Sequence, residues 1–190
     1  MLVVLAGLLL VAGCSLSSGP SDGAFVFGGT GGRTTVTYDP PETRGVLPAV
    51  SGESLLEPGR QLSSEAYRGQ VVVLNVWGSW CGPCRAEADA LDQVAAASAP
   101  RGVQFLGIDV RDQRDAAADF VRDRGVLYPS IYDPPGRSLL ALRGYPRNAV
   151  PSTIVLDRSH RVAAVFLTAV LASDLQPVVD RIAAEPAPAS

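Results

Sequence analysis

The sequence predicts an α/β domain built on a mixed β-sheet. Residues 71–76 and 103–109 are apolar runs of strand length, rich in β-branched side chains, and each is followed by a segment of helical pattern. Residues 153–156 and 162–166 are two more strand patterns, separated by a polar turn over residues 157–160. Alternating strands and helices followed by a hairpin are typical of a sheet with both parallel and antiparallel pairs.

Composition suits one globular domain with extensions. The chain has 190 residues, of which 47% are hydrophobic and 18% charged. The formal net charge is −3, which does not favour a nucleic-acid-binding surface. Of the three cysteines, Cys14 stands near the N-terminus and Cys81 and Cys84 form a close pair.

Residues 1–13 are predicted to be a signal peptide. The stretch is apolar, has the length of a signal-peptide hydrophobic region and is too short to span a bilayer. Its end, Val11-Ala12-Gly13-Cys14, resembles a bacterial lipobox, which implies cleavage before Cys14 and lipidation of that residue. The alternative is an ordinary signal peptide with an unrelated cysteine. We expect the domain to lie outside the cytoplasm, anchored by lipid to the outer face of the bacterial cell membrane.

Residues 14–45 are predicted to be a flexible tether because they are rich in Ser, Gly, Thr and Pro. The glycines at residues 28–32 lack the lysine and the strand–helix frame of a phosphate-binding loop. The globular domain is then expected over residues 46–186, followed by a disordered tail at residues 187–190.

The domain should begin with a short hairpin. The turn signal Glu-Pro-Gly at residues 57–59 separates two short strands, predicted at residues 54–56 and 60–62. This N-terminal hairpin would precede the strand at residues 71–76.

A helix is predicted from Cys81 to about Ser98, with Pro83 tolerated in its first turn. At about 100° per residue, one stripe of this helix faces inward. Its members are Cys84, Glu87, Ala88, Leu91, Val94, Ala95 and Ser98.

The later elements complete the sheet. A helix over residues 112–124 is expected to be capped by Asp112, and a short strand is expected at residues 127–132. A short helix should cover residues 138–142. The last helix should start at a capping box formed by Ser173 and Gln176.

The pair Cys81 and Cys84 favours thiol–disulfide chemistry because a strand leads into it and a helix follows it. Two other readings are half of a zinc site and a structural disulfide. A zinc site needs four ligands, and the chain offers only Cys14 and His160 besides the pair; His160 is interpreted as a turn residue. A bridge across two residues closes a short loop and contributes little stability.

With Trp-Cys-Gly-Pro-Cys at residues 80–84, the strand before it and Val-Pro-Ser-Thr at residues 150–153, the chain resembles the thioredoxin superfamily. It is most similar to the TlpA/ResA branch of extracytoplasmic thiol–disulfide oxidoreductases. The resemblance covers roughly residues 47–185 and implies a thioredoxin fold.

Three features support that branch. Asn75 stands where cytoplasmic thioredoxins carry a buried aspartate, and Glu87 is the third residue after Cys84. An inserted strand–helix segment occupies residues 103–129. The approach to Pro151 departs from the family pattern Gly-Val-x-Gly-x-Pro, so a specific substrate is not implied by it.

The resemblance implies a catalytic role for each residue of the motif. Cys81, at the helix start, would be the nucleophile, where the helix dipole and N–H groups, including that of Cys84, favour a thiolate. Cys84 would be the resolving thiol. Asn75 cannot take a proton, so Glu87 would accept the Cys84 proton from a half-buried position with a raised pKa. Spacing alone equally allows a solvated helix glutamate.

Pro151 would be a cis-proline packed against the disulfide, and the backbone of Val150 would pair with substrate. Trp80, Gly82 and Pro83 would line the substrate-binding rim, with Trp80 shielding the sulfurs and Trp77 in the core. No cofactor is implied beyond the cysteine couple, and no metal.

The expected function is a membrane-anchored reductant of protein disulfides, with apocytochrome c haem-site cysteines as the substrate and a membrane thiol carrier as electron donor. The main alternative is a general extracytoplasmic thiol oxidant or disulfide-exchange protein, because the motif does not set the reduction potential. A copper-binding module would need a wider cysteine spacing and a nearby histidine. A peroxidase would need a lone cysteine supported by Thr and Arg.

Overall fold

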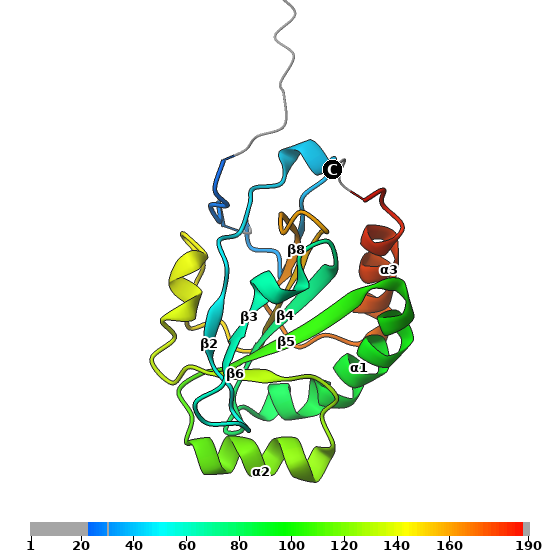
Figure 1. The fold of residues 1–190 in the computed structure, drawn as a ribbon. Coiled ribbons are helices and arrows are strands. Elements are labelled where there is room, and N and C mark those ends of the chain that lie inside the picture. Colours follow the sequence, from blue (N-terminus) through cyan, green and yellow to red (C-terminus); the bar gives the residue numbers. More distant parts are fainter. Residues whose placement is uncertain (1–22, 30, 188–190) are drawn as a thin grey trace, which may run out of the picture.

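The computed structural model describes residues 23–29 and 31–187, and a central sheet of six strands in the order β1-β8-β7-β4-β5-β6 organises them (Figure 1). Strands β4, β5 and β6 are parallel, whereas β7, β8 and β1 are added in antiparallel orientation. The predicted α/β class with a mixed sheet is confirmed. The bounds are Thr35–Thr37 (β1), Val71–Trp77 (β4), Val103–Asp109 (β5), Ser130–Tyr132 (β6), Ser152–Leu156 (β7) and Val162–Phe166 (β8).

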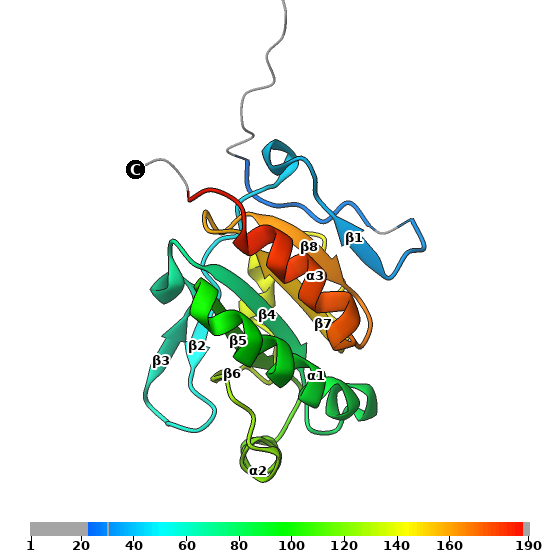
Figure 2. The ribbon, with the colours of Figure 1, turned by 90° about the vertical axis from the view of Figure 1, so that its right-hand side faces the viewer.

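Two helices, α1 and α3, lie side by side on one face of the sheet (Figure 2). Helix α1 spans Gly82–Ser98, α2 spans Arg114–Arg124 and α3 spans Ala172–Ala183. Within residues 23–29 and 31–187, four short 3-10 helices join the larger elements: Pro41–Thr43 (η1), Ser64–Tyr67 (η2), Ala99–Arg101 (η3) and Ser138–Ala141 (η4).

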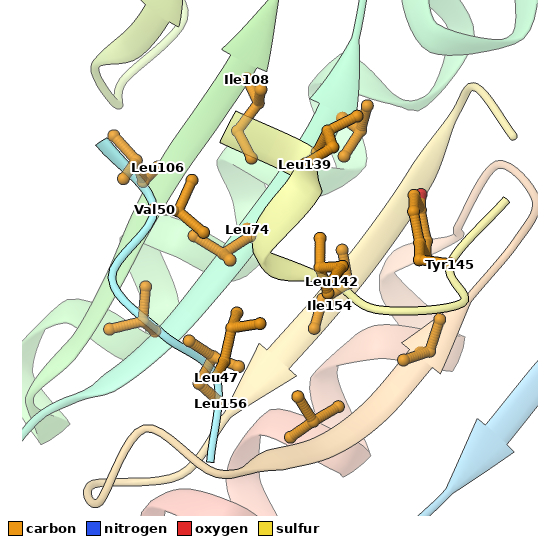
Figure 3. Packing of buried hydrophobic residues seen from close by; sticks show 14 of the residues in the cluster. Leu47, Val50, Leu74, Leu106, Ile108, Leu139, Leu142, Tyr145, Ile154 and Leu156 are labelled. Carbon is orange, nitrogen blue, oxygen red and sulfur yellow. The ribbon is translucent and has the colours of Figure 1, made fainter. Parts of the chain in front are cut away.

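Strand β4 is buried along its whole length, and its side chains alternate between two hydrophobic clusters. Leu74 and its neighbours two residues away join the cluster shown in Figure 3, which the N-terminal segment and η4 cover. Val71 and Val73 face the opposite cluster, against α1 and α3. The same alternation points Asn75 toward α1, so β4 carries one polar side chain into the helical face.

The N-terminal segment is part of the fold. Phe25 and Phe27 are buried, and β1 pairs with β8 along its three residues. The predicted tether is therefore wrong for residues 23–29 and 31–45, because these scattered apolar side chains, although set among glycines, cover one face of the sheet.

Several predictions fall outside the described residues. They are the signal peptide at residues 1–13, the lipidation of Cys14, the first part of the tether, and residues 188–190 of the tail. Within the part of the chain that the structure describes, no helix is long and apolar enough to cross a membrane.

The N-terminal hairpin exists with a shifted first strand. It pairs β2 (Ser51–Glu53) with β3 (Gln61–Ser63), so the strand predicted at residues 54–56 is wrong. Leu55 donates its backbone N–H to Ser130 O and buries its side chain beside the cysteines, which takes it out of the hairpin.

Two helix starts also differ from the prediction. Helix α2 begins two residues after Asp112, whose carboxylate binds Ser79 as well as the Gln113 N–H. Helix α3 begins before the predicted capping box, and the Gln176 side chain donates to Ser98 and Asp180 instead.

Arg44 joins three distant parts of the chain. Its fully buried guanidinium donates to Asp39 at 2.9 Å, to Asp157 at 3.1 Å and to both carboxylate oxygens of Glu185 at 2.7 Å. These partners lie in the N-terminal segment, in the β7–β8 turn and just after α3. A bidentate ion pair of this kind depends on planar guanidinium geometry.

We expect Arg44→Met to lower the free energy of unfolding by about 3 kcal/mol, because it removes a fully buried guanidinium and leaves the largely buried Asp157 and the partly buried Glu185 without their charged partner. Chemical denaturation at neutral pH measures this. Arg60→Met is the matched control, since Arg60 pairs with Glu57 on the surface and its side chain is 60% exposed. Equal effects of the two substitutions would contradict a structural role for the Arg44 network.

Candidate active site

The cysteine pair lies at the start of α1, shortly after the end of β4. Cys81 is the N-cap of the helix, and Cys84 lies in its first turn. The two sulfurs form a disulfide with an S–S distance of 2.07 Å, and both residues are buried. The Cys84 backbone N–H points at Cys81 Sγ, 3.2 Å away.

This geometry favours charge on Cys81 when the disulfide is reduced. The dipole of α1 stabilises a nearby anion by about 0.3–1 kcal/mol, which is less than one pKa unit. The Cys84 N–H adds a direct hydrogen bond, as expected from the sequence. Cys81 can therefore act as a thiolate, while Cys84 lies on the inward stripe of the helix.

Glu87 is buried on the same stripe, one turn beyond Cys84. Only 3% of its surface is exposed. Its Oε1 accepts a hydrogen bond from Asn75 Nδ2 at 2.9 Å, and its Oε2 accepts one from the Val170 backbone N–H at 2.9 Å. The solvated position that spacing alone allowed is excluded by this burial.

Burial raises the pKa of Glu87 to about 7, and the hydrogen bonds from Val170 and Asn75 oppose the rise. Near neutral pH the carboxyl group can thus both accept and release a proton, as a general base must. Because Asn75 replaces an acid, Glu87 shares this pocket with an amide and not with a second negative charge.

The predicted cis peptide bond is present between Val150 and Pro151. The Val150 side chain packs against the cluster that contains both cysteines. Within the described part of the chain, nothing hydrogen-bonds to the Val150 backbone, since the ladder between β4 and β7 begins at Ser152. An extended peptide could use these free groups.

The other residues predicted to contact substrate surround the buried disulfide. Gly82 and Pro83 are exposed at the start of α1. Trp80 is 50% exposed, and its indole N–H donates to Val110 O at 3.1 Å. Trp77 is buried, as predicted, and donates to Ser130 Oγ. Shielding of the sulfurs by Trp80 stays a prediction.

His160 lies away from this site. It occupies the β7–β8 turn with a φ of 56°, at the opposite end of β7 from Pro151, and its Nε2 faces Tyr67 O. The turn interpretation of His160 is confirmed. Among the described residues, no group of three or more His, Cys, Asp or Glu side chains could hold a metal ion.

Two hydrogen-bonding arrangements around the site are not predicted from the sequence. The Val170 N–H that binds Glu87 comes from the β8–α3 loop, and a backbone donor leaves no signal in the sequence. The Tyr145 hydroxyl lies against Ser152 Oγ and donates to Ala149 O at 3.3 Å, closing the loop that precedes Pro151. In the sequence, the only signal of this closed loop is that the residues before Pro151 depart from the family pattern.

A family model described as AhpC/TSA matches residues 47–165. The chain belongs to the AhpC/TSA family. This stretch runs from the segment before β2 to the end of β8, so it holds the cysteine pair, Glu87 and Pro151. The family is thioredoxin-like, which agrees with the mixed sheet and helices described above.

Curated relatives carry names from thiol–disulfide chemistry. The thiol:disulfide interchange protein DsbE of Vibrio cholerae is 34% identical over 125 residues, which are 63% of this chain and 64% of that protein. The thiol-disulfide oxidoreductase ResA of Geobacillus thermodenitrificans is 26% identical over 65% of this chain and 70% of its own length. The match to the Vibrio protein thus spans slightly less than two thirds of that relative.

A solved structure shows the same fold over nearly the whole described chain. The secreted thiol-disulfide isomerase from Corynebacterium glutamicum has a TM-score of 0.78 and 45% sequence identity. The similarity covers 83% of this chain and 99% of that one.

We expect Glu87 to make stability depend on pH. The unfolded chain releases this proton near pH 4.5 and the folded protein near pH 7, so the free energy of unfolding should fall as pH rises through that window. The fall attributable to Glu87 is about 3 kcal/mol. Denaturation curves of the oxidised protein at pH 4.5 and 7.5 should show a fall that is smaller in Glu87→Gln than in the wild type by this amount, because buried Asp109 contributes a fall of its own to both proteins.

Asp89→Asn is the matched control for that measurement, because Asp89 lies on the same helix with its side chain 83% exposed. It should retain the wild-type pH dependence. If Glu87→Gln and the wild type lost stability in parallel, the raised pKa would be contradicted.

Proposed function

We propose that this protein is a thiol–disulfide oxidoreductase that reduces protein disulfides outside the cytoplasm. The observation that carries the proposal is the Cys81–Cys84 disulfide at the start of α1, with Glu87 buried one turn further along the same stripe. The DsbE and ResA names of its relatives support this reaction class.

The reduced protein would act in two exchange steps. The Cys81 thiolate attacks a sulfur of the substrate disulfide, the substrate S–S bond breaks, and a mixed disulfide forms while one substrate thiolate leaves. The Cys84 thiol then transfers its proton to the Glu87 carboxylate and attacks the Cys81 sulfur. The second substrate thiolate leaves, two electrons have passed to the substrate, and the Cys81–Cys84 disulfide remains.

The environment of Glu87 suits the second step. Its hydrogen bonds from Asn75 and Val170 stabilise the carboxylate that accepts the proton, while burial stabilises the protonated product. Glu87 would later return the proton, when a dithiol donor such as a membrane thiol carrier reduces the disulfide again. No further cofactor is needed for this cycle.

We assign oxidised haem-site cysteines of apocytochrome c as the substrate. The assignment rests on the resemblance to the TlpA/ResA branch and on the DsbE and ResA relatives. The substrate would bind across Val150, Trp80, Gly82 and Pro83. Attachment to the outer face of the membrane through lipidated Cys14 belongs to the same proposal, and it would keep the site beside membrane-bound partners.

A second candidate is general disulfide exchange or oxidation of secreted proteins. The similar structure from Corynebacterium glutamicum is described as a secreted thiol-disulfide isomerase, which favours this alternative. The reduction potential of the Cys81–Cys84 couple against glutathione separates the two. A value near about −270 mV supports a reductant, and one above about −150 mV would reject it. Copper binding has no support here, because His160 lies away from the cysteines.

We expect Cys84→Ser to trap substrate and Cys81→Ser not to do so. Without the resolving thiol, the mixed disulfide between Cys81 and an oxidised Cys-x-x-Cys-His peptide should accumulate. Non-reducing electrophoresis and mass spectrometry detect it, with Cys14→Ser added to both proteins to remove the third thiol. Trapping by Cys81→Ser alone would reverse the assigned roles.

We expect Glu87→Gln to lower the disulfide reductase rate at pH 7 by about tenfold or more, because the Cys84 proton loses its acceptor. The rate is measured under single-turnover conditions with reduced protein across pH 5.5–9. Asp89→Asn serves as the control on the same helix and should keep the wild-type rate. A pH–rate profile unchanged by Glu87→Gln would exclude Glu87 as the proton acceptor.

A further inference from the structure

The residues that immediately precede Cys81 are held by the segment at residues 109–112. The Val110 N–H donates to Trp77 O at 3.0 Å, and the Trp80 indole N–H donates to Val110 O at 3.1 Å. The Arg111 guanidinium lies 4.8 Å from the centre of the Trp80 ring, a cation–π distance. The chain therefore enters the active site along this second segment.

Within this segment, the Asp112 carboxylate binds Ser79 through two hydrogen bonds. Its Oδ2 accepts the Ser79 backbone N–H, and its Oδ1 accepts the Ser79 hydroxyl at 3.0 Å and the Gln113 N–H at 2.7 Å. Charged acceptors make stronger hydrogen bonds than neutral ones. The position of Ser79, two residues before the nucleophile, thus depends on the Asp112 carboxylate.

Asp109 is the last residue of β5, three residues before Asp112, and is completely buried. Among the described residues, no N–H or O–H donor serves either of its carboxylate oxygens. A buried carboxylate without donors is costly, so this side chain favours the neutral acid. A neutral acid carries one O–H, which can donate to the carboxylate of Asp112, three residues further along the chain.

The charged groups around Asp109 favour its protonated, neutral form. Arg114 faces it from the start of α2, but that guanidinium is engaged by Glu53 Oε2 and by the carbonyls of Ser54 and Leu55. Burial, and then the charge and hydrogen bond of Asp112, raise the pKa of Asp109 to about 8.

The remaining neighbours add no compensating positive charge. From β6, Tyr132 donates its hydroxyl to Asp112 O. Asp133 donates its backbone N–H to Asp109 O and turns its carboxylate to the N–H groups of Arg137 and Ser138. Trp77 is the residue opposite Asp109 on β4.

We propose that Asp109 is a positioning residue for the redox site, donating its carboxyl proton to Asp112 so that Asp112 keeps Ser79, and through it Cys81, in place for attack. The proposal rests on the proposed thiol–disulfide function. The shared proton leaves one negative charge on the pair. Loss of this proton puts a negative charge on buried Asp109 beside the half-buried Asp112 carboxylate, and their repulsion breaks the contact with Ser79.

Asp109→Asn separates this role from simple packing. The amide has nearly the same shape and keeps an N–H donor for Asp112 at every pH. We expect equal reductase rates for wild type and Asp109→Asn at pH 6.5. At pH 9 the wild type should be about threefold or more slower than the variant, the effect of losing about one hydrogen bond.

The oxidised protein gives a second readout that is independent of cysteine titration. Tryptophan fluorescence should show an inflection near pH 8, since Trp77 and Trp80 contact this segment. Asp109→Asn should remove the inflection. Glu87→Gln should retain it, as should Asp119→Asn, an exposed control on α2.

Carboxyl carbon NMR of the oxidised wild type tests the same point without any substitution. A titration of Asp109 near pH 8, coupled to Asp112, supports the proposal, and a titration of Asp109 near pH 4 overturns it. Superimposable pH–rate profiles of wild type and Asp109→Asn also overturn it. A protein without reductase activity would reject the proposed function, whereas the NMR and fluorescence results would still report on the carboxyl pair.

Discussion

Burial of β4 on both faces is the constraint on which the active site depends. Because the strand is covered by α1 and α3 on one side and by the N-terminal segment and η4 on the other, its register cannot slip by one residue. That register aims Asn75 at Glu87 and ends the strand at Trp77, so the cysteines emerge at the helix start. The cysteine pair, the proposed proton acceptor Glu87 and the Asn75 amide that binds it are therefore positioned by one strand.

The site is finished by segments that are remote in sequence. The β8–α3 loop supplies the Val170 N–H to Glu87, and the end of β5 supplies Asp112 to Ser79. Pro151 comes from the start of β7. The surroundings of Cys81 thus depend on three loops at the same end of the strands. At the other end of β7, Arg44 binds Asp157 and so connects distant parts of the chain.

Local patterns predicted much of this architecture. The apolar runs gave β4, β5 and β8 with nearly their observed bounds, and the inward stripe of α1 matches its buried residues. Predictions from local patterns were wrong where side chains contact residues that are distant in the sequence. The sequence predicts Asp112 as a helix cap, yet its carboxylate binds Ser79. The sequence also predicts a tether at residues 23–29 and 31–45, because two phenylalanines among glycines give no periodicity that would reveal their burial.

The reaction class follows from the amino-acid sequence alone. A Cys-x-x-Cys pair between a buried strand and a helix, with Glu87 one turn beyond, is a local arrangement that chain geometry largely dictates. The burial of Glu87 between Asn75 and Val170, and of Asp109 at a position without hydrogen-bond donors, becomes visible only in the folded chain. The protonation of these carboxyl groups at neutral pH depends on desolvation and on neighbours that come from elsewhere in the chain. Spacing along the sequence gives no information on either.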